Sequence, residues 1–200
     1  VVQPRCRAAL GGLLVLYVLI AAFWSVFDRG ASRWVAQAEK MERNLWGWEV
    51  LPSQMQSLNS ILVLLLIPLF TLVVYPRVGR VVTLTALRRI GAGFVVTIGA
   101  VAVSWWIEKQ LAAGVPLHIG WQALAYLLLT TAEILISITA LEFSYTQAPL
   151  RLKSFIMSLY LLSVALGNFF TAQVNGWIER QGGAAGLDGP AYYLFFLKVI

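Results

Sequence analysis

The sequence predicts an all-helical membrane protein. Hydrophobic residues make up 60% of the 200 residues and charged residues only 12%, whereas charged residues are about 25% of an ordinary soluble domain. The apolar residues form long uninterrupted runs, and the basic residues lie in short clusters between them. A helix needs about 20 apolar residues to cross a bilayer, so these runs are interpreted as membrane spans. The net charge of +6 then belongs to loops at a membrane surface, and we expect no nucleic acid partner.

Six spans are expected. The first, residues 8–27, contains no charge and is not followed by the small residues of a signal-peptide cleavage site, so we expect it to be retained. The polar loop after it is rich in tryptophan, as membrane interfaces are. The second span, residues 52–75, begins at a proline, which suits a helix start. Pro68 inside this span should kink it.

The remaining spans follow the same pattern. The third is expected at residues 90–107, where glycines offer close helix contacts. The fourth, residues 117–148, ends before a proline, and the fifth, residues 154–178, is free of charge. The sixth begins at residue 191 and has only the residues up to 200, fewer than a full crossing needs. We therefore expect one bundle over residues 1–200 with a truncated last helix.

Basic residues give the expected orientation. With the N-terminus inside the cell, eight basic residues lie in inner loops and six in outer loops, and a bias of this sign favours that topology. The eight are Arg5, Arg7, Arg77, Arg80, Arg88, Arg89, Arg151 and Lys153. The sequence thus predicts a multi-pass protein of a cell (inner) membrane.

Glu133 lies in the middle of the fourth span. A charge at this depth costs about 2.5–3.5 kcal/mol on insertion scales, so such residues usually have a function. Tyr126, Thr130, Ser137 and Ser144 recur at helical spacing around it, so they are expected to share its helix face. Because lipid disfavours such a polar stripe, we interpret this helix as one wall of a solute pathway.

Other polar residues are weaker candidates when taken singly. Asp28 lies at the end of the first span with Trp24 one turn before it, but this position by itself favours a solvated interfacial carboxylate paired with an arginine, because the ends of spans are wet. Asn59 and Tyr160 also fit simple helix packing. The only histidine, His118, is expected to be structural. The sequence contains no metal-ligand spacing, phosphate loop or nucleophile motif, so we expect no enzyme, metal or cofactor.

Three strings resemble a known family. They are FWSVFDRGASRWVAQAEKM, PSQMQSLNSILVLLLIPLFTLVVYP and AEILISITALEFSYTQAPLRLKSFIMSLYLLSVALGN. Their order and spacing resemble the second half of the proton-dependent oligopeptide transporter family, within the major facilitator superfamily. The resemblance covers nearly all of residues 16–178. It implies the C-terminal six-helix bundle of a twelve-helix fold, with the N-terminal bundle absent from this chain.

The resemblance also implies roles for individual residues. The substrate is expected to be a di- or tripeptide carried together with protons by alternating access. Trp24, Asn59 and Tyr160 are expected to line the peptide site. Glu133 is expected to receive the peptide's amino terminus, with the hydroxyl of Ser137 one turn later.

The same resemblance links an acid of the first span to gating and proton coupling, which in this chain is Asp28. Two positions depart from the family pattern. Many relatives have glutamine where this chain has Arg29, and tryptophan is frequent where this chain has Tyr160. The family motif ExxERFxYY does not occur in these 200 residues, so the chain resembles a C-terminal half without its partner. Its start without methionine and its end inside an expected helix favour a fragment over a misread frame. A carrier of nitrate or another small solute, or a membrane sensor or scaffold, remains the alternative. Glu133 argues against an anion.

Overall fold

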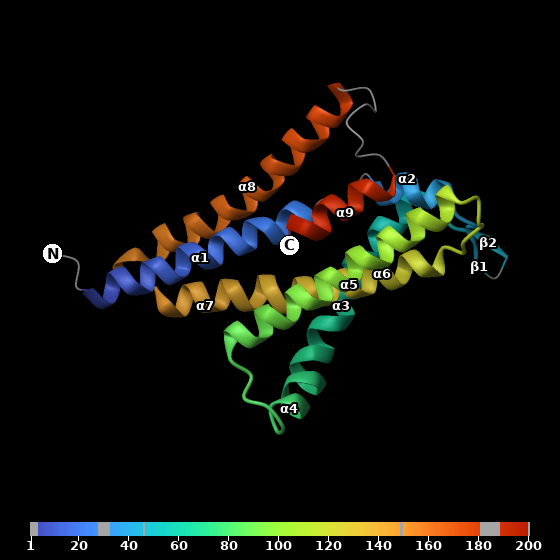
Figure 1. The fold of residues 1–200 in the computed structure, drawn as a ribbon. Helices are drawn as coiled ribbons and strands as arrows, with labels where there is room; N and C mark the ends of the chain where they lie inside the picture. The colour runs from blue at the N-terminus through green and yellow to red at the C-terminus, as the bar shows by residue number, and fades with distance from the viewer. Residues whose placement is uncertain (1–3, 28–32, 46, 149, 181–188, 200) are drawn as a thin grey trace.

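The computed structural model describes residues 4–27, 33–45, 47–148, 150–180 and 189–199, and most of them are helical (Figure 1). The elements in chain order are α1 (Pro4–Phe27), α2 (Arg33–Glu39), β1 (Asn44–Leu45), β2 (Trp48–Glu49), α3 (Pro52–Leu69), η2 (Phe70–Val74), α4 (Tyr75–Val78), α5 (Ala86–Ala112), α6 (Gly120–Glu133), η3 (Ile134–Ile138), α7 (Thr139–Gln147), η4 (Leu150–Leu152), α8 (Lys153–Arg180) and α9 (Pro190–Val199). The two short strands form an antiparallel hairpin.

Four helical stretches in the described part of the chain are long and apolar enough to cross a membrane. They are Pro52–Val78, Ala86–Ala112, Gly120–Gln147 and Lys153–Ile178. Each has at least 26 residues, which at 1.5 Å per residue is about 39 Å or more and exceeds the hydrocarbon core of about 30 Å. A shorter apolar stretch, Gly11–Phe27, lies within α1.

The helices extend beyond the apolar runs that predicted them. The helix expected at residues 90–107 covers Ala86–Ala112, because the Thr85 side chain caps its start by accepting a hydrogen bond from the Arg88 backbone N–H at 3.4 Å. Hydrophobicity marks only the part of a helix inside the lipid. The polar turns at its ends carry no such signal.

The fourth span begins later than residue 117. Leu117 and Ile119 bond instead through their backbones to Glu42 (Glu42 N to Leu117 O 2.8 Å; Ile119 N to Glu42 O 2.9 Å). α6 then starts at Gly120, whose N–H donates to His118 Nδ1 at 3.0 Å. His118 Nε2 lies 3.0 Å from the Asn44 carbonyl oxygen, so this histidine ties the hairpin to the start of α6.

Two π-helical turns interrupt the spans. The turn η2 begins two residues after Pro68, where the sequence predicts a kink. A π-turn is one of the adjustments that satisfy backbone groups freed by proline in a membrane helix. The turn η3 lies between α6 and α7 and begins directly after Glu133. No sequence pattern predicted it.

α1 lies alongside α8 (Figure 1). A Cβ placed on Gly167 of α8 would come within 2.4 Å of the Ala21 carbonyl oxygen and 3.1 Å of Trp24 Cβ. The Thr171 hydroxyl donates to the Ser25 carbonyl at 2.6 Å. Glycine is therefore required for the two backbones to approach this closely.

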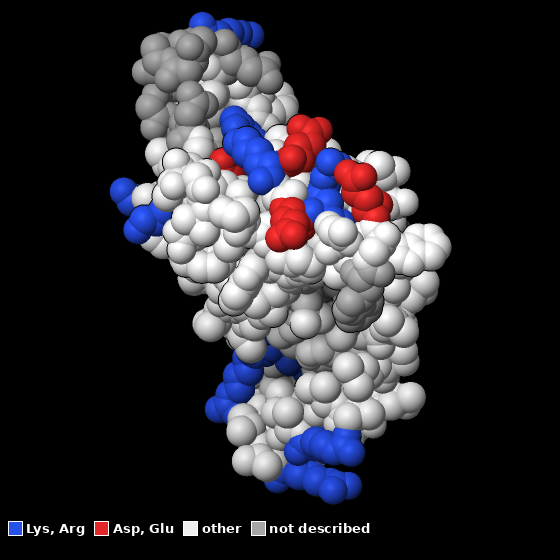
Figure 2. Space-filling model, turned by 90° about the vertical axis from the view of Figure 1, so that its right-hand side faces the viewer, with Lys and Arg blue, Asp and Glu red and all other residues white. Residues whose placement is uncertain are grey.

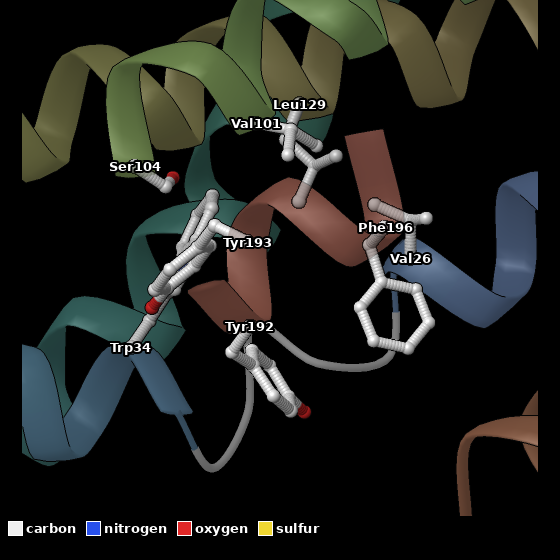
Figure 3. A pocket seen from close by; sticks show the side chains of 8 residues that line it. All are labelled: Val26, Trp34, Val101, Ser104, Leu129, Tyr192, Tyr193 and Phe196. Carbon is white, nitrogen blue, oxygen red and sulfur yellow. The ribbon is translucent and has the colours of Figure 1, made fainter. Parts of the chain in front are cut away.

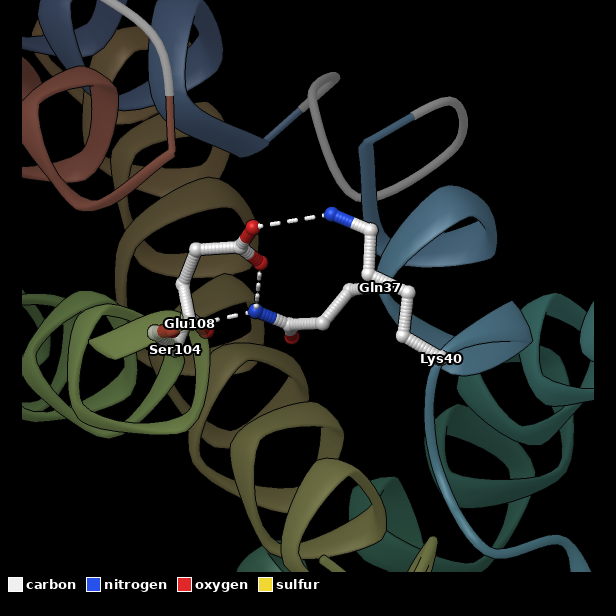
Figure 4. Close-up of polar contacts among 4 residues, drawn as sticks. All are labelled: Gln37, Lys40, Ser104 and Glu108. Carbon is white, nitrogen blue, oxygen red and sulfur yellow. Dashed lines mark hydrogen bonds and ion pairs between the residues drawn. The ribbon is translucent and has the colours of Figure 1, made fainter. Parts of the chain in front are cut away.

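The short helix α2 is anchored by buried polar groups (Figure 4). Gln37 Nε2 donates to Glu108 Oε2 at 2.9 Å and to the Ser104 carbonyl at 3.1 Å. Lys40 Nζ lies 3.3 Å from Glu108 Oε1. These contacts hold α2 against the C-terminal part of α5.

Charge is distributed unevenly over the molecule. Figure 2 looks onto the end that carries α2 and the hairpin, and shows acidic and basic side chains side by side there, while the charged side chains visible on this face towards α4 are basic. Glu142, near Arg89 and Tyr75, is an acidic residue at that end of the molecule. The sequence from residue 50 to residue 107 contains four arginines and no acidic residue. The orientation expected from these same basic residues stays a prediction.

Candidate functional site

Glu133 lies halfway along the membrane stretch Gly120–Gln147. It is the last residue of α6, and it is partly buried. Asn59 Nδ2 of α3 lies 3.5 Å from Glu133 Oε2 as a hydrogen-bond donor. The predicted pair of carboxylate and amide is therefore brought together from two helices. Its partial exposure leaves the carboxylate accessible to a further partner.

Thr130 completes this pair. Its hydroxyl lies 2.5 Å from Asn59 Oδ1 and 2.8 Å from the Tyr126 carbonyl oxygen. Thr130 is fully buried and lies one turn before Glu133 on α6. The sequence placed Thr130 on the same face as Glu133 but gave no sign of its contact with Asn59, which depends on how α3 packs against α6.

Tyr160, Ser137 and Trp24 form the other side of the cluster. The Tyr160 hydroxyl donates to the Ser137 carbonyl at 3.3 Å, and Tyr160 lies within electrostatic range of Glu133. The Trp24 indole interacts with Tyr160, although its buried Nε1 makes no well-aligned hydrogen bond with any described group. The Ser137 hydroxyl oxygen is likewise buried and unpaired within the described part of the chain.

The polar stripe predicted around Glu133 is divided in the structure. Tyr126 packs its ring edge-on against Trp34 of α2, with centroids 4.5 Å apart. Ser144 is fully buried beside Tyr17. The expectation of one continuous polar face was wrong for Ser144, because η3, which begins after Glu133, holds an extra residue in its turn and changes the register of the helix. Tyr126, Thr130 and Glu133 lie in the regular turns of α6 and keep a common face, and the Tyr126 ring is covered by α2. Only Thr130, Glu133 and Ser137 remain near the site.

Two predicted features lie outside the described residues. Asp28, the candidate for proton coupling, belongs to residues 28–32, as does Arg29. Their expected roles stay predictions. Among the described residues, no three His, Cys, Asp or Glu side chains gather as a metal ion would require.

A separate apolar cavity lies between α2, α5 and α9 (Figure 3). It measures about 20 Å³ and is lined by Trp34, Ser104 and Tyr193 among others. This volume is enough for about one water molecule. Neither Asn59 nor Glu133 lines it, so we interpret it as a packing space of the helical core.

The long apolar helices and their arrangement define a membrane protein with a major facilitator-type fold. A family model described as the POT family matches residues 3–186. The chain belongs to this family, whose members are transporters and not enzymes. Family membership confirms the predicted family, the fold class and the expectation that the protein is no enzyme.

Similar proteins agree with this assignment. Peptide transporter PTR2 of Saccharomyces cerevisiae is 32% identical over 169 residues, which is 76% of this chain and 27% of that protein. Solute carrier family 15 member 2 of Oryctolagus cuniculus is 35% identical over 130 residues, which is 64% of this chain and 18% of that protein. The chain thus spans about a quarter or less of the length of these relatives.

Solved structures agree as well. The crystal structure of the POT family transporter PepTSo matches 96% of this chain and 39% of its own chain, with 40% identity and a TM-score of 0.83. An auto-inhibited POT family peptide transporter matches 96% of this chain and 38% of its own, with 36% identity and a TM-score of 0.85. The chain therefore spans less than half of these transporters.

Proposed function

We propose that this chain is the C-terminal bundle of a transporter that carries di- and tripeptides together with protons across the cell (inner) membrane. Family membership and the names of the similar proteins support peptide transport. The short coverage of those relatives supports an opposing N-terminal bundle in the complete transporter. The observation that carries the proposal is a partly exposed carboxylate, Glu133, held by Asn59 halfway through a membrane helix.

The chemistry of Glu133 fits a peptide's amino terminus. An ionised carboxylate accepts hydrogen bonds only, and an ammonium group donates only. In a site shielded from water the charge-assisted bond between them is strong. When Glu133 takes up a proton it loses its charge, and the peptide is released. Asn59 keeps one oxygen of the carboxylate satisfied in the absence of substrate.

Further groups complete the proposed peptide site. Ser137, one turn after Glu133, offers a hydroxyl, Tyr160 offers a phenol near both, and Trp24 beside Tyr160 offers an indole N–H. These groups can bind the carbonyl groups of a short peptide. Asp28 is proposed as the group that couples proton movement to the opposing bundle, on the basis of the sequence resemblance. The rival substrate, a small anion such as nitrate, is disfavoured because Glu133 would repel it.

The test is uptake of a labelled dipeptide into vesicles by the complete transporter. Glu133→Gln keeps the size of the side chain and removes its charge, so pH-driven accumulation above the external concentration should be lost. Glu39→Gln is the matched control, because Glu39 is exposed on α2, and it should behave as wild type. Full accumulation by Glu133→Gln contradicts the proposal, and binding without any uptake by wild type favours a sensor.

A further inference from the structure

The inference concerns the contact between Thr130 and Asn59. An amide side chain has a donor end and an acceptor end, and which end faces a neighbour follows from that neighbour's chemistry. An ionised carboxylate accepts only, so Asn59 can bond to it only through its N–H₂ group. The amide oxygen of Asn59 then points the opposite way, to the hydroxyl of Thr130 at 2.5 Å.

Thr130 can donate a hydrogen bond to the amide oxygen of Asn59. Its hydroxyl carries one proton, and two acceptors lie in reach: Asn59 Oδ1 at 2.5 Å and the Tyr126 carbonyl at 2.8 Å. The Tyr126 carbonyl belongs to the same helix, where a backbone N–H is its usual partner. Asn59 Oδ1 is the closer of the two acceptors, so we expect the Thr130 hydroxyl to donate its proton to it.

Thr130 is also held more firmly by its surroundings than Asn59 and Glu133 are. It is fully buried, whereas Asn59 and Glu133 are both partly exposed. Thr130 and Glu133 are one turn apart on α6, so they move together, and Asn59 is on α3. The hydroxyl therefore sets the direction of the amide relative to the carboxylate.

We propose that Thr130 is a positioning residue: its hydroxyl holds the Asn59 amide with the N–H₂ group facing Glu133, and this arrangement sets the affinity for a substrate's amino terminus. The inference rests on the proposed function, because it assigns a role in the same site. Without the hydroxyl, the Asn59 oxygen loses its partner, and the amide no longer has one preferred orientation. Thr130 itself need not touch the substrate.

The test compares dipeptide uptake by the complete transporter carrying Thr130→Val or Thr130→Ser. Valine keeps the shape of threonine and removes the hydroxyl, so KM should rise about tenfold while the maximal rate stays within about twofold. Serine keeps the hydroxyl and should restore a KM close to wild type. Thr131→Val is the matched control, because adjacent helix residues point about 100° apart, and its KM should not change.

A double-variant cycle with Asn59→Leu identifies the partner. If Thr130 acts through Asn59, adding Thr130→Val to Asn59→Leu raises KM no further. An additive rise, an unchanged KM in Thr130→Val, or an equal defect in Thr130→Ser overturns the inference. Should Thr130→Val fail to reach the membrane, Thr130→Ala takes its place in the comparison. KM should then rise in Thr130→Ala and stay close to wild type in Thr130→Ser, since only serine keeps the hydroxyl.

A second substrate separates this inference from the proposed function. Wild type should prefer a free dipeptide to its N-acetylated form, and Glu133→Gln should lose this preference. If Glu133→Gln loses it and Thr130→Val keeps a wild-type KM, only the role of Thr130 is wrong. If Glu133→Gln keeps the preference, the proposed role of Glu133 fails whatever the result for Thr130.

Discussion

A carboxylate inside a membrane protein is stable only where other groups compensate for its loss of water. Glu133 has the Asn59 amide within 3.5 Å, and this amide is in turn held by Thr130. One hydrogen bond leaves most of the carboxylate's capacity to accept unused, since an ionised carboxylate has about four lone-pair sites. That unused capacity, on a partly exposed group, is what a cationic substrate group can use.

Tyr160 gives a test at the same scale. Its hydroxyl donates to the Ser137 carbonyl on the side of the cluster that faces Glu133. Tyr160→Phe removes this bond and one polar group of the site, so peptide KM should rise about threefold to tenfold, as expected for a bond worth about 1 kcal/mol.

The matched control for this prediction is Tyr17→Phe. The Tyr17 hydroxyl makes a bond of similar length, 3.2 Å, to the Ile156 carbonyl. Tyr17 is buried in the core between α1, α7 and α8, so this variant should lower the melting temperature and leave KM unchanged. Equal effects of both variants on KM would mean that Tyr160 acts only through stability.

The residues of the site were predictable to different degrees. Glu133 and its depth follow from the sequence, because a lone acid in a long apolar run is conspicuous. The place of Asn59 in the same site was expected only through the family resemblance, and its bond to Glu133 was not predicted. The role of Thr130 was not predictable, because the contact joins residues 71 positions apart, and a pattern along one helix says nothing about the side chain opposite.

At the scale of elements, the position of α1 depends on its contact with α8. This contact positions Trp24, because Gly167 of α8 packs against the α1 backbone on either side of Trp24. A larger residue there separates the two helices and moves one wall of the site. The contacts of Gln37 and Lys40 with Glu108 have a related effect elsewhere, since they fix α2 against α5.

Gly167→Ala tests the helix contact. The added Cβ would lie 2.4 Å from the Ala21 carbonyl oxygen and 3.0 Å from the Ser25 backbone nitrogen, and neither backbone atom can turn away. We expect a loss of about 1–3 kcal/mol in the free energy of unfolding, seen as a lower melting temperature in detergent.

Gly176→Ala is the control on the same helix. A Cβ at Gly176 meets nothing within 4 Å, and alanine favours a helix over glycine by about 1 kcal/mol. This variant should therefore be neutral or slightly stabilising. A stable Gly167→Ala with normal uptake would show that the two helices have room to separate.

Hydropathy predicted where the long helices lie but not where they begin and end. The apolar runs located all the long helices, but α5 continues by several polar residues at each end. The π-turn after Glu133 was not predictable, because residues 134–138 are as apolar as any other part of the span. Its effect is large nonetheless, since it divides the predicted polar stripe.

At the scale of the whole molecule, charge sets the orientation in the membrane. Val81 lies in the connection between α4 and α5, and Val115 in the connection between α5 and α6. The 27 residues of α5 separate them, a length of about 40 Å. They must therefore lie on opposite sides of a bilayer.

Cysteine labelling tests the predicted direction. In a background in which Cys6, the only cysteine of these 200 residues, and any cysteine elsewhere in the transporter are replaced by serine, Val81→Cys should react with an impermeant maleimide only from the inside. Val115→Cys should react only from the outside. Both positions are exposed, at 84% and 43%. The opposite pattern would invert the topology, and labelling of both from one side would contradict the span assignment.

The fold class was the most predictable property, because the bilayer restricts a chain of this composition to helices. How the helices face one another was not predictable from composition. Asn59 and Glu133 are brought together by the packing of α3 against α6, and this depends on side chains from both helices.

The central claim is that Glu133 receives the amino terminus of a peptide. It is tested most directly by a structure of the complete transporter with a dipeptide bound. The account predicts the peptide's ammonium nitrogen about 2.7–2.9 Å from a carboxylate oxygen of Glu133, with Asn59 still bonded to Thr130. A peptide bound with its amino terminus elsewhere, and Glu133 paired only with protein groups, would contradict it.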